Sequence, residues 1–193
     1  MRLTSSTALL GLALLVGCAQ PPAPNLGADP NLPASLRNMV ADPAQTAINN
    51  TAAVFGNPAS IAGRPAQAAT AISQLEWLTV DIVTDQRWIG MQGPLTQQLQ
   101  AGRAEMRRTL GIPAEATPNA VIGAMDGAAA ALRANNRAGA SAALAAVTGA
   151  GGGDRALGVL SALPALPAVQ RATMATQQAM NRLDQETSAR SND

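Results

Sequence analysis

Aromatic side chains are almost missing from a chain that is otherwise rich in apolar residues, and this shortage limits the folds open to it. Hydrophobic residues make up 47% of the sequence, yet there is no tyrosine, one phenylalanine (Phe55) and two tryptophans (Trp77 and Trp88). Strands favour aromatic and β-branched residues, whereas alanine favours helices and lets them approach closely. The composition therefore predicts an all-α fold with an alanine-rich core.

Prolines and glycines divide the chain into segments of helical length. Proline is tolerated at the first position of a helix, because its missing N–H would have no partner there, and glycine often follows the last turn. Within the segments, apolar residues recur at spacings of three and four, which is typical of helices. We expect a single bundle of six to eight short and medium helices in a domain over 34–188, followed by a disordered tail over 189–193. The expected helices are 43–55, 58–63, 65–85, 94–110, 118–134, 137–148, 154–164 with Asp154 as its cap, and 167–187. The glycine-rich run over 149–153 is interpreted as a flexible break.

The first 18 residues have the pattern of a removable leader. Arg2 precedes an apolar run over 8–16, which is too short to cross the roughly 30 Å of a bilayer's hydrocarbon core. The run ends in Leu15-Val16-Gly17-Cys18, which resembles the lipobox of bacterial lipoproteins. This resemblance implies a signal peptide over 1–17, cleavage between Gly17 and Cys18, and acylation of the Cys18 thiol. The expected partner of the acylated cysteine is membrane lipid.

Residues 18–33 would then join the lipid to the domain. Five of them are proline, which favours extended polyproline II geometry, so we expect a tether. In lipoproteins an aspartate directly after the cysteine commonly retains the protein at the inner membrane, and this chain has Ala19 there. The resemblance therefore implies the periplasmic face of the outer membrane if the source is Gram-negative.

The residue types present argue against an enzyme. The chain has no histidine and no lysine, and its single cysteine is assigned to lipid, so imidazole bases, Schiff bases and a free thiol nucleophile are excluded. Its 12 acidic residues are dispersed, with neither zinc-ligand nor calcium-loop spacing. We therefore expect no catalysis, no metal and no cofactor. The net charge of +1 and scattered arginines also predict no nucleic-acid binding.

The segment 75–93 gathers both tryptophans with charged and apolar neighbours. One hypothesis is a ligand or partner groove formed by Trp77, Trp88, Met91 and Arg87, because aromatic residues dominate binding surfaces. The alternative is that a core short of aromatics places its two largest side chains at its centre, and tryptophan's usual burial favours this. Two carboxylates of the segment, one helical turn apart, are interpreted as solvated charges near a helix end.

A cluster of three arginines has a simple structural explanation. Arg103, Arg107 and Arg108 occupy the last turns of a predicted helix, where they would complement its dipole and pair with Glu105. The alternative hypothesis gives these arginines a second role, the binding of anionic lipid headgroups.

A small-residue face lies on the helix predicted over 118–134 and comprises Gly123, Gly127 and Ala131. Glycine costs about 1 kcal/mol relative to alanine inside a helix, so this face predicts close approach of another backbone. We expect that backbone to belong to the same chain. A homodimer seam is the alternative, and the oligomeric state stays open.

Two hypotheses about function follow. The first is a membrane-anchored lipoprotein of the cell envelope that acts as a non-catalytic interaction or scaffold module with an envelope protein as partner. The second is a periplasmic carrier or chaperone that binds an apolar ligand near Trp77 and Trp88. A solid core around the two indoles would favour the first, and a cavity beside them the second.

Overall fold

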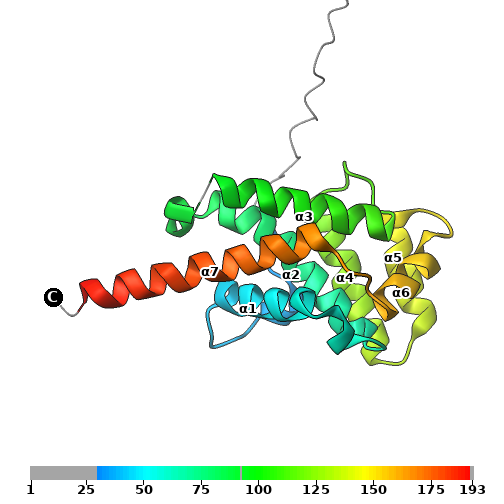
Figure 1. The fold of residues 1–193 in the computed structure, drawn as a ribbon. Helices are drawn as coiled ribbons and strands as arrows, with labels where there is room; N and C mark the ends of the chain where they lie inside the picture. Colours follow the sequence, from blue (N-terminus) through cyan, green and yellow to red (C-terminus); the bar gives the residue numbers. More distant parts are fainter. Residues whose placement is uncertain (1–29, 92, 192–193) are drawn as a thin grey trace, which may run out of the picture.

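Seven α-helices make up most of the computed structural model, which describes residues 30–91 and 93–191 (Figure 1). Short turns and two 3-10 helices join them, a third 3-10 helix precedes the first α-helix, and no strand occurs in these ranges. The prediction of an all-α bundle is therefore confirmed. The helices are α1 (Pro43–Gly56), α2 (Pro65–Thr84), α3 (Pro94–Leu110), α4 (Pro118–Arg133), α5 (Arg137–Thr148), α6 (Gly152–Ser161) and α7 (Pro167–Arg190), with η1 (Ala34–Leu36), η2 (Pro58–Ile61) and η3 (Gln86–Met91).

The expected leader over 1–17, the cleavage site at Gly17 and Cys18, and residues 18–29 of the expected tether lie outside the described residues. None of the described helices is long and apolar enough to cross a membrane.

Local sequence chemistry explains where the helices begin. Three of them have a polar side chain that accepts hydrogen bonds from backbone N–H groups of the first turn: Asp42 caps α1, Thr117 caps α4 and Asn136 caps α5. Proline occupies the first position of five of the seven α-helices in the described ranges: Pro43, Pro65, Pro94, Pro118 and Pro167.

The prediction fails at the start of α6. Asp154 was expected to cap this helix after a flexible glycine run, but α6 already begins at Gly152 and Asp154 lies in its first turn. Gly151, in the left-handed conformation with φ of 77°, is the residue at the cap position. At the other end of the chain, α7 continues to Arg190, so 189–190 of the expected tail are helical.

The helix α2 lies at the centre of the bundle and packs against α1, α3 and α4. Every residue over 71–80 is buried, so this stretch has no face turned to solvent. The helices α4, α5 and α6 pack successively on one another, and α7 then returns across α3 and α1. Figure 1 shows the C-terminal end of α7 projecting beyond the other helices.

The buried apolar residues form two clusters. The first contains Phe55 and lies among α2, α4, α5 and α6, which contribute many alanines. The second contains both tryptophans, together with apolar residues from the start of α1, the end of α2, the start of α3 and the middle of α7. The predicted alanine-rich core is therefore present, with the three aromatic residues divided between its two clusters.

Candidate functional site

The burial of α2 forces its polar side chains to find partners inside the protein. Ser73, Gln74, Glu76 and Thr79 are all buried, and a buried polar group without a hydrogen bond is costly. Each of them is bonded, and none of the described buried side-chain nitrogens and oxygens lacks a partner. The contacts to other elements are Ser73 Oγ to Asp126 Oδ1 (2.8 Å), Asn50 Nδ2 to Gln74 Oε1 (2.6 Å), Gln74 Nε2 to Ser35 Oγ (3.1 Å) and Gln100 Nε2 to the Thr79 carbonyl (3.2 Å).

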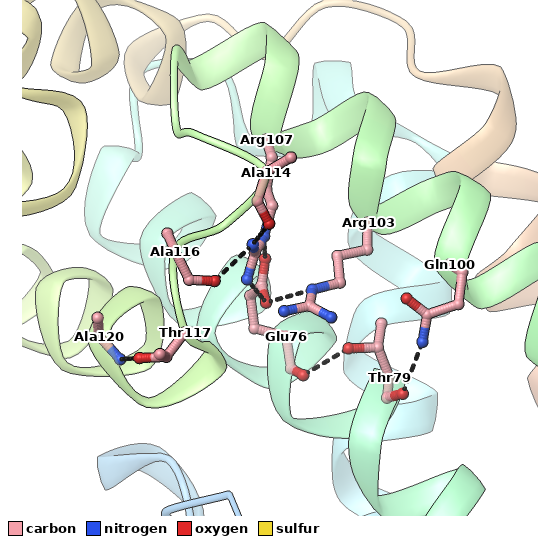
Figure 2. A network of polar contacts seen from close by, with 9 residues as sticks. All are labelled: Glu76, Thr79, Gln100, Arg103, Arg107, Ala114, Ala116, Thr117 and Ala120. Atoms are coloured by element: carbon pink, nitrogen blue, oxygen red, sulfur yellow. Dashed lines mark hydrogen bonds and ion pairs between the residues drawn. The ribbon is translucent and has the colours of Figure 1, made fainter. Parts of the chain in front are cut away.

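Glu76 is the centre of a buried ion-pair network between α2 and α3 (Figure 2). Arg107 donates from Nε to Oε1 at 2.7 Å and from Nη2 to Oε2 at 2.8 Å, while Arg103 donates from Nε to Oε2 at 3.0 Å. Arg107 also donates from Nη1 to the carbonyls of Ala114 and Ala116, at 3.0 and 2.7 Å. A single side chain therefore links two helices and the loop that precedes α4.

Burial makes this network electrostatically demanding. Glu76 is 1% exposed, Arg107 3% and Arg103 5%, and the three groups carry a net charge of +1 away from bulk water. Burial lowers the pKa of Arg103, and the neighbouring Glu76 carboxylate opposes this effect. Guanidinium groups donate to both carboxylate oxygens, so the network holds α2 and α3 together.

The sequence-based interpretation of the α3 arginines is wrong for two of them. Arg103 and Arg107 were expected to complement the helix dipole at the surface and pair with Glu105, but both are buried against Glu76. Arg108 is exposed. Glu105 instead accepts the backbone N–H groups of Ala168 and Val169, at 2.8 and 3.0 Å. It therefore caps α7, which has no capping side chain from its own N-cap residue.

The two tryptophans of the expected groove lie in the second core cluster. Trp77 is 5% exposed and Trp88 7%. The indole Nε1 of Trp88 donates to Asp81 Oδ2 at 3.0 Å, so the ring is held from η3 against the end of α2. The backbone of Arg87 and Met91 belongs to η3, but their side chains lie outside the described part of the structure. Burial of both tryptophans favours the core hypothesis for this segment over the groove hypothesis.

The expected close-packing face on α4 is also corrected. Gly123 and Gly127 are exposed, and a Cβ at Gly123 would meet nothing within 4 Å. A Cβ at Gly127 would touch only the Ala143 Cβ at 3.4 Å, while Ala131 is half-buried against the first core cluster.

Close backbone approach occurs at two other glycines. A Cβ at Gly153 on α6 would collide with the carbonyl of Ser141 on α5, and one at Gly102 on α3 would lie 3.2 Å from the Cα of Val169 on α7. Gly153 therefore requires glycine, and Gly102 is a tight contact that a side chain could enter only if α7 shifted slightly.

The end of the expected tether is packed on the bundle. The backbone N–H of Asn31 donates to Asn119 Oδ1 at 2.6 Å, and that of Ala34 donates to Asp126 Oδ2 at 2.7 Å. Leu36 is buried in the second core cluster. We call residues 31–36 the docked segment. It lies beside the first half of α4.

The chain matches no protein family, no curated protein and no solved structure. Among the described residues, no group of three or more His, Cys, Asp or Glu side chains is placed to hold a metal ion.

Proposed function

We propose that this protein is a lipoprotein of the cell envelope, anchored to the membrane through acylated Cys18, whose helical bundle is a non-catalytic interaction or scaffold module. The observation that carries this proposal is the sequence Leu15-Val16-Gly17-Cys18, which resembles a lipobox. The docked segment adds a limit on how far the bundle can lie from the anchor. Only 12 residues lie between Cys18 and Asn31, which is the first of the described residues with a bond to the bundle, so the linker spans at most about 45 Å. An acyl chain on Cys18 would hold the bundle close to the bilayer surface.

The interior of the bundle supports a structural role. Its buried charges are committed to one another in the Glu76 network, and its polar side chains along α2 link neighbouring helices. The absence of histidine and lysine from the sequence supports a non-catalytic role as well. Burial of Trp77 and Trp88 supports a scaffold over a carrier with an apolar site at the indoles.

The proposed location is the periplasmic face of the outer membrane if the source is Gram-negative, from Ala19 after the lipidated cysteine. The proposed partners are membrane lipid and an envelope protein. Such a protein would contact the outer surface of the bundle, since the interior is occupied by the chain itself.

Membrane fractionation and mass spectrometry test the anchor. Wild-type protein should fractionate with membranes and carry acyl mass on an amino-terminal Cys18, whereas Cys18→Ser should remain uncleaved or become soluble. Ala23→Ser, within the expected tether, is the matched control and should behave as wild type. Wild-type protein without acyl mass, together with a Cys18→Ser variant that fractionates identically, would refute the lipoprotein proposal.

Crosslinking in the native envelope tests the interaction role. Captured material is analysed by mass spectrometry for both proteins and lipids. A specific protein crosslinked to the bundle supports the scaffold proposal. An apolar molecule retained in stoichiometric amounts by the purified bundle, without a protein partner, would favour a carrier instead.

A further inference from the structure

A pocket of about 550 Å³ lies where α2 begins and where α4 gives way to α5. Three arginines line it: Arg64 directly precedes α2, Arg133 is the last residue of α4 and Arg137 is the first residue of α5. No aspartate or glutamate is among the described residues of its wall. The pocket therefore concentrates three positive charges of an almost neutral protein without an acidic side chain to balance them.

Two of these arginines are placed where a cation is unfavourable. The amino-terminal end of a helix carries a partial positive charge, so acidic residues usually occupy the first turn. Neither α2 nor α5 has an acidic residue there, and Arg64 and Arg137 stand at the two helix starts instead. An anion in the pocket would interact favourably with both helix ends and with both guanidinium groups.

The backbone around the pocket is held in place. Arg133 donates from Nη2 to Thr70 Oγ1 at 2.7 Å, and this hydroxyl donates in turn to the Ala66 carbonyl at 3.0 Å. Arg133 is thereby fixed against α2. The turn between α4 and α5 is closed by a 2.8 Å hydrogen bond from Asn136 N–H to the Ala131 carbonyl.

The turn before α2 is fixed in the same way. The N–H of Gly63 donates to the Ser161 carbonyl at the end of α6, at 2.9 Å, and the N–H of Arg64 donates to the Ile61 carbonyl at 2.9 Å. The backbone at all three arginines is therefore held in place, and their side chains are exposed to solvent around the pocket.

We propose that this basic pocket binds a doubly charged oxyanion, specifically a phosphate monoester group. Guanidinium groups donate paired hydrogen bonds to phosphate oxygens, and three of them suit a dianion better than a single carboxylate. The side chains of Gln67 and Asn135 also line the pocket and add amide donors. Its volume is in the range of small-ligand sites. This site is independent of the lipid anchor and goes beyond the scaffold role.

The phosphate could belong to a lipid headgroup or to a soluble ester, and the vesicle measurement below decides between them. The docked segment is bonded to Asn119 near the start of α4, whereas the pocket is formed by Arg133 at the end of the same helix. Fourteen residues of helix separate these positions by about 21 Å. The pocket thus lies at the opposite end of α4 from the attachment of the tether.

Equilibrium dialysis of the full chain against radiolabelled inorganic phosphate at low ionic strength tests the site. Wild-type protein should bind one phosphate, and the triple Arg→Gln variant of the pocket should bind at least about tenfold more weakly, because it loses charge-assisted contacts. The matched control removes three exposed arginines of α7 and should bind as wild type. The pocket variant changes Arg64, Arg133 and Arg137, and the control changes Arg171, Arg182 and Arg190.

The same measurement distinguishes a lipid source of the phosphate from a soluble one. It also distinguishes failure of the phosphate site from failure of the lipoprotein proposal. Detergent-solubilised protein is used first, so the measurement does not depend on a membrane. A protein that binds phosphate but lacks acyl mass would refute only the lipoprotein proposal. The protein is then reconstituted in phosphatidylcholine vesicles with or without phosphatidic acid. Competition by phosphatidic acid identifies a headgroup ligand, and its absence identifies a soluble one. Equal phosphate binding by wild type and the pocket variant would overturn the site.

Discussion

Arg107 holds both carboxylate oxygens of Glu76, with its Nε 2.7 Å from Oε1 and its Nη2 2.8 Å from Oε2. This paired geometry joins α3 to α2 at a point where both side chains are shielded from solvent. The remaining nitrogen of Arg107 holds the loop that precedes α4 through two carbonyls. Three parts of the bundle therefore depend on one ion pair, which makes it the most informative place to perturb stability.

Replacing Glu76 by glutamine should destabilise the protein strongly. The amide is similar in size but leaves two buried guanidinium groups without a counter-charge, which typically costs about 3–5 kcal/mol. Urea unfolding followed by circular dichroism measures the free energy of unfolding. Glu115→Gln, at an exposed carboxylate, is the control and should change it by less than about 0.5 kcal/mol. Similar unfolding curves for the two variants would contradict the structural role of the network.

The two arginines of the network should not be equivalent. Arg107→Met removes both bonds to the carboxylate oxygens and the donor for two loop carbonyls, whereas Arg103→Met removes a single bond and leaves the Arg107 pair intact. Burial already disfavours the charged form of Arg103, as its lowered pKa indicates. We expect Arg103→Met to lose less than half as much unfolding free energy as Arg107→Met in the same urea experiment. A larger loss of unfolding free energy for Arg103→Met than for Arg107→Met would contradict this prediction.

Alanine substitutions at two helical glycines should have opposite signs. At Gly123 the new methyl group enters open space and alanine is the better helix former, so stability should rise by up to about 1 kcal/mol. At Gly153 the methyl group would collide with the Ser141 carbonyl of α5, so stability should fall by about 1–3 kcal/mol or more. Thermal melts at two protein concentrations give both values and reveal a homodimer contact if the shifts depend on concentration.

Removing the Glu105 carboxylate should loosen the start of α7. Glu105→Ala frees the N–H groups of Ala168 and Val169, and loss of a helix cap usually costs about 1 kcal/mol. Amide hydrogen exchange should become faster in the first turn of α7 and remain unchanged in α5. Unchanged exchange at Ala168 and Val169 would show that the cap contributes nothing.

Tryptophan fluorescence should report two buried indoles. Trp77 and Trp88 lie in the second core cluster, so iodide should quench the native protein weakly and the guanidinium-unfolded chain strongly. Trp77→Phe and Trp88→Phe separate the two contributions. Strong iodide quenching of the native protein would show that the two indoles are exposed and would favour the groove hypothesis.

Much of the fold could be predicted because helix boundaries depend on local chemistry. Pro94 begins α3, and Gly111, with φ of 75°, ends it while Ile112 N–H bonds back to the Arg107 carbonyl at 2.8 Å. These residues lie within a few positions of the boundary they set, so their pattern is visible in the sequence. The predicted helix over 137–148 agrees with α5 at both ends for the same reason.

The polar contacts could not be predicted because they join residues far apart in the chain. Glu76 meets Arg107 across 31 positions and Glu105 meets Ala168 across 63. A local argument offers Arg107 only neighbours on its own helix, which led to the incorrect pairing with Glu105. The sequence does contain one indication that Glu76 is buried. It lies between Leu75 and Trp77 in a helix whose length and apolar content fit burial on every side.

Glycine patterns were ambiguous for a related reason. A small-residue face shows that another backbone can approach but not whether one does. Gly123 and Gly127 form such a face and are exposed, whereas Gly153 belongs to a run interpreted as a flexible break and lies against α5. Which helix face meets a neighbour is decided by the packing of the whole bundle.

The docked segment also determines how the bundle would respond to mechanical load. Among the described attachments, a force applied through the amino terminus would act first on the bond from Asn31 to Asn119, then on the bond from Ala34 to Asp126, and afterwards on the buried side chain of Leu36. These contacts would break one after another, which requires less force than breaking all of them together. Tension on the linker would thus lengthen it by several residues before any of it reached α1 and the helices behind it.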